Sequence, residues 1–169
     1  KSAHVYRQCG EAEAYGVNTD SLAIDMQQVQ KRKKRIVGRL TKGVEGLLKR
    51  AGVELVRDHA TITGPETVKI GDKTVNTEHI LIASGSEPAV PPVNGMDSPC
   101  VLDSSGVLDL DHVPASMAII GAGVIGLEFA DVFSSLGTDV TVLEMLPRAG
   151  AGVSEDVVKR LTASLKKQG

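Results

Sequence analysis

The sequence has 169 residues, a length typical of about one domain, and its 19 basic and 21 acidic residues give a formal net charge of −2. This balance supplies no excess of positive charge for general nucleic-acid binding, and 41% hydrophobic with 24% charged residues argues against disorder of the whole chain. No apolar run approaches the ~18 residues of a membrane-spanning helix, and the first residues lack the apolar centre of a signal peptide. We therefore expect no nucleic-acid partner, no membrane partner, and a cytoplasmic location, or the mitochondrial matrix in a eukaryote.

The N-terminal part of the chain predicts two helices. Residues 1–15 have a helical pattern that begins without a capping residue. A long amphipathic helix is predicted over residues 25–50, because its apolar residues recur at spacings of three and four, with Asp25 to cap its start and Gly52 to end it. The basic run 31–35 lies inside this helix, and we interpret it as a solvated helix face rather than a phosphate-binding or targeting patch.

The middle of the chain predicts short strands. Turn residues separate four runs of strand-forming residues and favour a small antiparallel meander: 53–56, 59–63, 67–70 and 73–75. Residues 79–83 form an almost wholly apolar run, typical of a strand buried on both faces, which stops at residues 84–86. The prolines that follow predict a stiff linker.

A different pattern begins at Ser116. The pattern predicts a buried strand at 117–120, a glycine-rich turn at 121–126, a helix at 127–136 and a second strand at 138–143. A last helix is predicted at 154–167, with Gly169 as its stop signal. A half-unit of this kind has too few strands to cover both faces of a parallel sheet. Together with the uncapped first helix, this predicts that the chain is a piece of a longer protein.

The glycine-rich turn is the segment of the sequence that most clearly predicts ligand binding. Residues 121–126, Gly-Ala-Gly-Val-Ile-Gly, fit the pattern G-x-G-x-x-G between a predicted strand and a predicted helix, and Glu144 follows Gly126 by 18 positions at the end of the next strand. This context is typical of a dinucleotide-binding fold rather than a merely structural turn. Gly121 permits the tight turn, Gly123 lets a pyrophosphate approach the backbone, and Gly126 lets helix and strand pack closely.

The helix and the second strand then supply the remaining contacts. The helix N-terminus offers N–H groups and a partial positive charge to the phosphates. Glu144 can accept hydrogen bonds from ribose hydroxyls and would repel a 2′-phosphate, which favours NAD over NADP. Glu128, near the start of the helix, is explained without a ligand by the helix dipole.

Several segments together resemble the flavin-dependent pyridine nucleotide–disulfide oxidoreductase family. Residues 80–88, Ile-Leu-Ile-Ala-Ser-Gly-Ser-Glu-Pro, resemble the family segment IIIATGSxP, and residues 119–128 resemble its NAD fingerprint. The segments 142–144, 150–153 and 165–169 are similar to the dihydrolipoamide dehydrogenase branch of this family. The resemblance covers essentially the whole chain and implies that it is a central fragment of such a protein.

The resemblance implies an α/β fold made of parts of two Rossmann-like three-layer nucleotide-binding domains, FAD first and NAD second, with a small antiparallel β-meander. Residues 1–92 would be the C-terminal part of the FAD-binding domain, with the long helix and the meander. Residues 93–115 would be a linker, and residues 116–169 the N-terminal half of the NAD-binding domain.

The resemblance also implies an enzyme, a dihydrolipoyl dehydrogenase that passes electrons from dihydrolipoamide through a redox disulfide and FAD to NAD. The substrate would be carried by the lipoyl domain of a 2-oxoacid dehydrogenase complex or of the glycine cleavage system, and the full-length protein would be a homodimer. The disulfide segment C-x-x-x-x-C is absent from this sequence, so we expect no catalytic residue in it, inert thiols at Cys9 and Cys100, and no activity of the fragment alone. A mercuric-reductase-like or transhydrogenase-like member, or a non-catalytic nucleotide-binding fragment, is the alternative.

The implied site residues fall into two groups, and none binds a metal. The NAD group comprises the fingerprint and the acid after the second strand: Gly121, Ala122, Gly123, Val124, Ile125, Gly126, Leu127, Glu128 and Glu144. The FAD group comprises Ala60, Ser84, Gly85 and Ser86, where Ser84 replaces the family's usual Thr and Ala60 a frequent glycine. Glu128 matches a family glutamate that pairs with a lysine near the flavin, and that lysine belongs to the absent disulfide segment.

Overall fold

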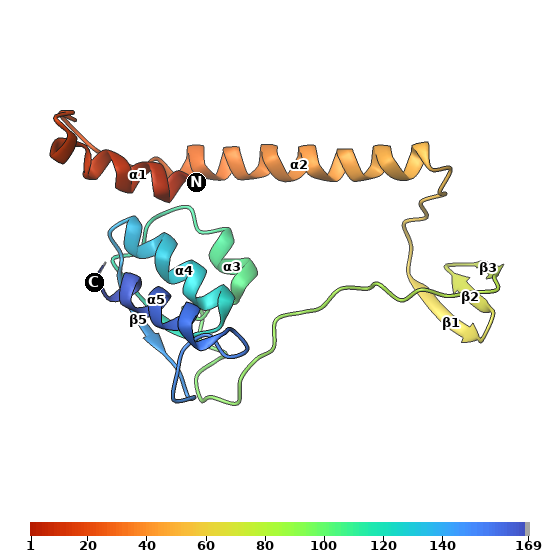
Figure 1. Ribbon diagram of the computed structural model, residues 1–169. Coiled ribbons are helices and arrows are strands. Elements are labelled where there is room, and N and C mark those ends of the chain that lie inside the picture. Colours follow the sequence, from red (N-terminus) through yellow and green to blue (C-terminus); the bar gives the residue numbers. More distant parts are fainter. Residues whose placement is uncertain (168–169) are drawn as a thin grey trace. The chain divides into compact units, whose positions relative to one another are not determined.

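The computed structural model describes residues 1–167 and divides the chain into two compact units. One unit holds residues 1–34 with the described residues from 99 onward, and the other holds residues 35–98. Figure 1 shows the elements of both in chain order. The domain boundaries expected at residues 92 and 115 stay a prediction.

The first unit is built on a strand–helix–strand arrangement. Strands β4 (Ser116–Ile120) and β5 (Asp139–Leu143) pair in parallel, in a register that runs from Ser116 opposite Asp139 to Ile120 opposite Leu143. Helix α4 (Val124–Ser135) connects them, as parallel pairing requires (Figure 1). The predicted order of elements is confirmed, and the helix begins three residues earlier than predicted.

The core of this unit gathers around α4. Its buried side chains recur at spacings of three along this helix and continue into the adjoining loops: Ala122, Leu127, Ala130, Phe133 and Leu136. Helix α1 (Ser2–Gly10) also contacts α4, and its Ala3 is buried. Arg7 Nη1 donates hydrogen bonds to Asp131 Oδ1 at 3.2 Å and to Ser135 Oγ at 3.0 Å, which fixes α1 along α4.

The predicted first helix is shorter than expected. It ends at Gly10, and a 3₁₀ helix, η1 (Ala12–Tyr15), follows before Gly16 turns the chain at a φ of 76°. Helix α2 (Met26–Arg50) confirms the predicted long helix. Asp25 Oδ1 accepts a hydrogen bond from Gln28 N at 3.0 Å, so it caps the start as expected, and Gly52 follows the end at a φ of 71°.

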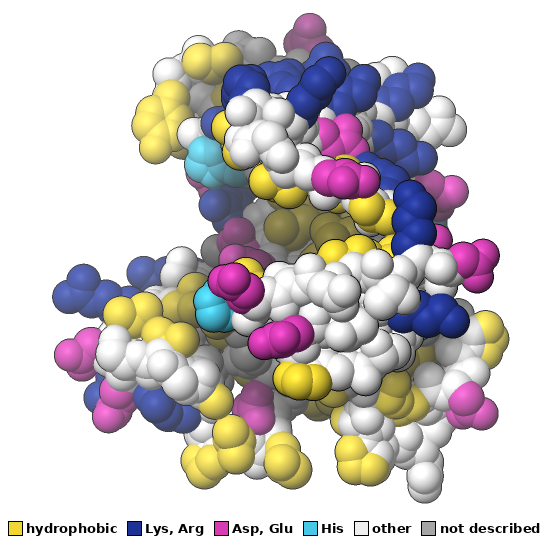
Figure 2. All heavy atoms as spheres, turned by 90° about the vertical axis from the view of Figure 1, so that its right-hand side faces the viewer, with side chains coloured by type: hydrophobic (Ala, Val, Ile, Leu, Met, Phe, Trp, Pro, Cys, Tyr) yellow, Lys and Arg dark blue, Asp and Glu magenta, His cyan; other side chains and the backbone are white. Residues whose placement is uncertain are grey.

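Helix α2 exposes both its basic and its apolar side chains, and none of its residues is buried. Figure 2 shows Lys and Arg side chains gathered over this helix at the top of the view. The interpretation of the basic run as a solvated face holds except at Lys33. Its Nζ donates to Leu108 O at 2.6 Å and pairs with the Asp109 carboxylate.

A short helix in the predicted linker was not expected. It is α3 (Ser104–Leu108), and Asp103 caps it by accepting hydrogen bonds from Ser105 N and Gly106 N. Gln30 Nε2 of α2 donates to Leu110 O at 2.6 Å just beyond this helix. An aspartate before Ser-Ser-Gly is an N-cap signal, so the start of this helix could have been predicted from the sequence. Hydrogen bonds from α2 therefore hold the end of α3 and the residues that follow it.

The last helix, α5 (Glu155–Lys166), begins after Ser154 as predicted. Its predicted stop at Gly169 lies outside the described residues. Among the described helices, none combines the length and apolar character needed to cross a membrane.

The second unit contains the predicted antiparallel meander. Strands β1 (Ala60–Gly64), β2 (Thr67–Ile70) and β3 (Lys73–Asn76) lie side by side in that order. Gly71 makes the turn between β2 and β3 at a φ of 55°, in the left-handed region that favours glycine.

Two predicted strands of this unit are wrong. Residues 53–56 and 79–83 are irregular, and the apolar side chains of Leu81 and Ile82 are 91% and 71% exposed. An apolar run becomes a strand only where a neighbouring strand pairs with its N–H and C=O groups. Neither segment has such a neighbouring strand among the described residues. The strand-forming sequence is therefore present, but the strand that would pair with it is not.

Candidate functional site

The glycine-rich turn lies where β4 ends. Gly121 follows the strand at a φ of 101°, a conformation that favours glycine, and its N–H donates to Leu143 O at 2.8 Å. Helix α4 begins three residues later at Val124. The turn therefore occupies the carboxyl edge of two parallel strands, which is where open α/β sheets bind ligands.

The two remaining glycines of the motif differ in their surroundings. A Cβ at Gly126 would lie 2.1 Å from Gly121 O, so α4 can approach the turn this closely only because residue 126 is glycine. A Cβ at Gly123 would meet no atom within 4 Å, and Gly123 has a φ of −73° that any residue adopts. Gly126 thus serves packing, whereas Gly123 leaves an open space beside the backbone.

The start of α4 has unsatisfied donors. Gly123 is its N-cap and provides no side-chain hydrogen bond, and the first bond of the helix runs from Leu127 N to Gly123 O at 3.0 Å. The amides of residues 124–126 precede that bond and have no acceptor earlier in the helix. Together with the helix dipole, they form a feature that attracts an anionic group.

The structure brings Glu144 to the same turn. Its Oε2 accepts a hydrogen bond from Ala122 N at 2.8 Å, and its Oε1 accepts one from Leu146 N at 2.8 Å. These backbone hydrogen bonds, with that to Leu146 the larger cause, lower the pKa of Glu144. A carboxylate has about four acceptor positions, so both oxygens keep capacity for hydroxyl donors.

We expect Glu144 to contribute to stability in a pH-dependent way. Because the pKa of Glu144 is lower in the folded than in the unfolded chain, its contribution is complete above the unfolded value of about 4.3 and is lost as the pH falls through the folded value. Thermal unfolding of a full-length protein that contains this chain should therefore show a Tm difference from Glu144→Gln that shrinks as the pH is lowered from 7 to about 3. A constant difference over this range would show that the charge is not held in this way.

The other predicted NAD residues separate into exposed and buried positions. Val124 and Ile125 expose their side chains at the start of α4, whereas Ala122 and Leu127 are buried in the core. Glu128 lies in the second turn of α4, because the helix begins earlier than predicted. Its side chain is exposed and forms no ion pair with another described residue. Its predicted role beside a flavin stays a prediction.

The predicted FAD residues lie in the second unit. Ala60 is the first residue of β1, and residues 84–86 follow the irregular segment that was expected to be a strand. All four are exposed, and Gly85 has a φ of 79°. The strand that was expected to end at residues 84–86 is therefore absent from this structure, and the binding of FAD by all four residues stays a prediction.

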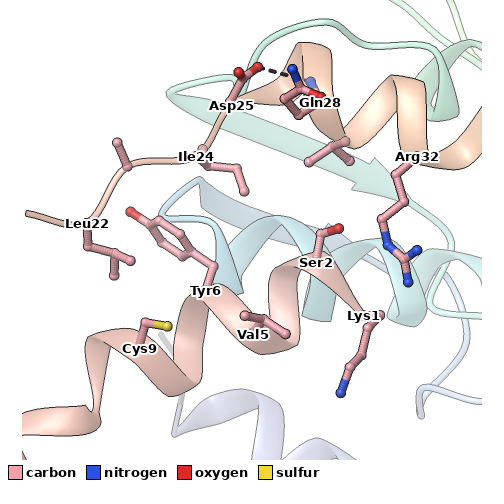
Figure 3. A pocket seen from close by; sticks show the side chains of 12 residues that line it. Lys1, Ser2, Val5, Tyr6, Cys9, Leu22, Ile24, Asp25, Gln28 and Arg32 are labelled. Atoms are coloured by element: carbon pink, nitrogen blue, oxygen red, sulfur yellow. Dashed lines mark hydrogen bonds between the residues drawn. The ribbon is translucent and has the colours of Figure 1, made fainter. Parts of the chain in front are cut away.

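A cavity lies elsewhere in the first unit. It has a volume of about 580 Å³ between α1, the residues before α2 and the start of α2. Figure 3 shows Tyr6, Leu22 and Ile24 around it, with Cys9 farther along α1. Its lining comes from residues 1–32 and includes none of the glycine-rich turn, so it is separate from the predicted NAD residues.

One contact of the turn has no counterpart among the sequence predictions. Gly150 N donates a hydrogen bond to Ala122 O at 2.7 Å, so the segment after β5 reaches back to the glycine-rich turn. The only signal in the sequence is the Gly-Ala-Gly run at 150–152, which marks a turn but not its partner.

Parallel strands, a glycine-rich turn into a helix and an acid after the second strand define a Rossmann-type dinucleotide-binding unit. The sequence matches the pyridine nucleotide-disulphide oxidoreductase family over residues 1–169, and the chain belongs to this family. FAD and NAD are the cofactors of its dihydrolipoyl dehydrogenase relatives.

Three curated relatives agree with this assignment. The chain is 39% identical over 160 residues, 91% of its length, to dihydrolipoamide dehydrogenase of Chaetomium thermophilum. It is 36% identical to mitochondrial dihydrolipoyl dehydrogenase of Dictyostelium discoideum and 37% identical to dihydrolipoyl dehydrogenase of Geobacillus stearothermophilus, over 99% of the chain in each case. It spans 32% to 36% of the length of these relatives.

The fold also matches a solved structure. The HOCl-induced flavoprotein disulfide reductase RclA of Escherichia coli superimposes with a TM-score of 0.78 at 26% identity, over 99% of this chain and 36% of that one. The predicted fold class, parts of Rossmann-like nucleotide-binding domains with a small antiparallel meander, is confirmed by this match and by the family.

Proposed function

We propose that this chain forms the central nucleotide-binding part of a flavin-dependent oxidoreductase that oxidises dihydrolipoamide to lipoamide and reduces NAD⁺ to NADH and H⁺. The observation that carries the proposal is the turn 121–126 with the Glu144 carboxylate bonded to it. The names of the relatives, which are dihydrolipoyl dehydrogenases at 36% to 39% identity, support the substrate. The dithiol chemistry would belong to a cysteine pair outside this sequence.

The remaining parts of the proposal follow the family. Residues 1–92 would complete an FAD domain, with Ala60 and residues 84–86 against the cofactor, and residues 116–169 would begin the NAD domain. Bound FAD would relay electrons from the dithiol to NAD. The parent protein would be a homodimer that accepts dihydrolipoamide from a lipoyl domain, in the cytoplasm or the mitochondrial matrix.

The acid after β5 gives the proposal its preference for NAD. The adenosine ribose of a dinucleotide on this turn would meet Glu144, whose oxygens keep acceptor positions for two hydroxyls. A 2′-phosphate at the same place would meet a carboxylate whose pKa is lowered and which is therefore charged at neutral pH. The charge repels NADP and leaves NAD unaffected.

Replacement of Glu144 tests this preference. In a full-length protein that contains this chain, Glu144→Ala should lower the ratio of kcat/KM with NAD to that with NADP by about tenfold or more, because the repulsion of the 2′-phosphate is removed. Asp139→Ala is the matched control, because Asp139 is an exposed acid at the opposite end of β5. An unmodified protein that uses NADPH as well as NADH would refute the assignment.

A second candidate function is reduction of a different disulfide. The match to RclA at a TM-score of 0.78 favours it, because that protein is a flavoprotein disulfide reductase of another kind. Dihydrolipoamide-dependent reduction of NAD by the full-length protein separates the two candidates. A full-length protein that is reduced by NADH but fails to react with dihydrolipoamide would support the second one.

A further inference from the structure

Ala122, the buried residue of the glycine-rich turn, forms hydrogen bonds through both its N–H and its C=O. Its N–H donates to Glu144 Oε2 at 2.8 Å, and its C=O accepts from Gly150 N at 2.7 Å. Ala122 is only 2% exposed. The segment after β5 therefore fixes both peptide groups that flank this residue.

The second of these peptide groups matters for a ligand. A peptide is planar and trans, so the C=O of Ala122 and the N–H of Gly123 belong to one rigid plane and point in opposite directions. When Gly150 holds the C=O, the Gly123 N–H must point away from Gly150. Gly123 is exposed and its missing Cβ would meet no atom within 4 Å. The hydrogen bond thus orients a donor on the open side of the turn.

Gly150 is itself held in a position that favours glycine. Its φ is 64°, and a Cβ there would lie 2.7 Å from Val158 Cγ2 of α5. Val158 is buried, and Val153 N donates to Gly150 O at 3.0 Å before α5 begins. Gly150 therefore lies between α5 and the turn, and its amide reaches Ala122 because no side chain intervenes.

We propose that Gly150 is a positioning residue for the dinucleotide: through the Ala122 peptide it aims the Gly123 N–H at the pyrophosphate. This assignment rests on the proposed function, because it presumes a dinucleotide on the turn. It adds a residue outside the G-x-G-x-x-G motif to the nucleotide site and makes α5 part of the support of that site.

The test compares two glycines of the same segment in a full-length protein that contains this chain. Gly150→Ala should weaken NADH binding about tenfold or more, because the methyl group displaces the amide from Ala122. Gly152→Ala is the control: its φ is 85° and it has open space around it, so it carries the same backbone strain without the contact, and we expect a change below about threefold. Calorimetric titration with NADH gives both affinities.

A rescue variant separates positioning from a general loss of structure. Val158→Ala removes the atom that a Cβ at position 150 would meet, so Gly150→Ala with Val158→Ala should regain NADH affinity to within about threefold of the unmodified protein. Val158→Ala alone should bind NADH normally. Equal losses in Gly150→Ala and Gly152→Ala, or no loss in either, would overturn the assignment.

Hydrogen exchange provides a measurement that needs no variant, should Gly150→Ala fail to fold. NADH binding should slow amide exchange in residues 146–152, because the Gly150 N–H bond to Ala122 O tightens when the turn is occupied. Unchanged exchange in this segment, with NADH bound, would overturn the assignment alone. A protein that binds no NADH would instead overturn the proposed function.

Discussion

Gly123→Ala in a full-length protein that contains this chain should weaken NADH binding by about tenfold or more, ~1.4 kcal/mol, while the Tm without nucleotide stays within about 2 °C. The conformation of Gly123 suits any residue, and an added Cβ meets no protein atom within 4 Å. The protein therefore gains no clash. The methyl group would instead fill the space through which a pyrophosphate approaches the backbone.

Gly126→Ala should show the opposite balance. Its Cβ would lie 2.1 Å from Gly121 O, a backbone atom that cannot move aside without shifting the turn or α4. We expect the Tm without nucleotide to fall by several degrees, roughly the effect of 1–3 kcal/mol of overpacking, and NADH affinity to fall with it. Calorimetric unfolding and NADH titration of both variants measure the contrast. A fall in Tm with Gly123→Ala, or unchanged NADH affinity, would contradict the assignment of this glycine.

The elements that the sequence predicted well are those specified by local chemistry. Asp25 caps α2, Gly71 turns the meander, and the spacing of the glycines at 121–126 marks the strand, turn and helix. Each of these depends on residues within a few positions of one another. The position of Glu144 at the turn was also predictable, because adjacent parallel strands end at the same edge of a sheet.

The contacts and irregular segments that could not be predicted from the sequence depend on residues far apart along the chain. Residues 79–83 have the composition of a buried strand, but strand pairing is a property of two segments, and no strand lies beside them among the described residues. The contact from Gly150 to Ala122 joins residues that are separated along the chain by all of α4 and β5. Lys33 likewise pairs with Asp109, which no pattern within the basic run could indicate.

Glu128→Gln should separate the electron-transfer role of α4 from its nucleotide-binding role. In a full-length protein that contains this chain, we expect electron transfer between dithiol and flavin to slow by about tenfold or more, and NADH affinity to change by less than about twofold. Glu128 is exposed in the second turn of α4 and forms no hydrogen bond to the glycine-rich turn. The amides of residues 124–126, which would face the phosphates of a bound dinucleotide, do not depend on its charge.

The expected slowing follows from the family resemblance, in which this glutamate pairs with a lysine near the flavin. Removal of the glutamate charge would leave that lysine without its partner, and glutamine keeps the shape of the side chain but not its charge. Stopped-flow measurement of both half-reactions, with NADH affinity measured separately, distinguishes the two roles. Asp131→Asn is the control for charge lost from α4, because Asp131 pairs with Arg7 instead. Normal electron transfer with weakened NADH binding would assign Glu128 to the nucleotide site, since only a contact with NADH itself would then account for the loss.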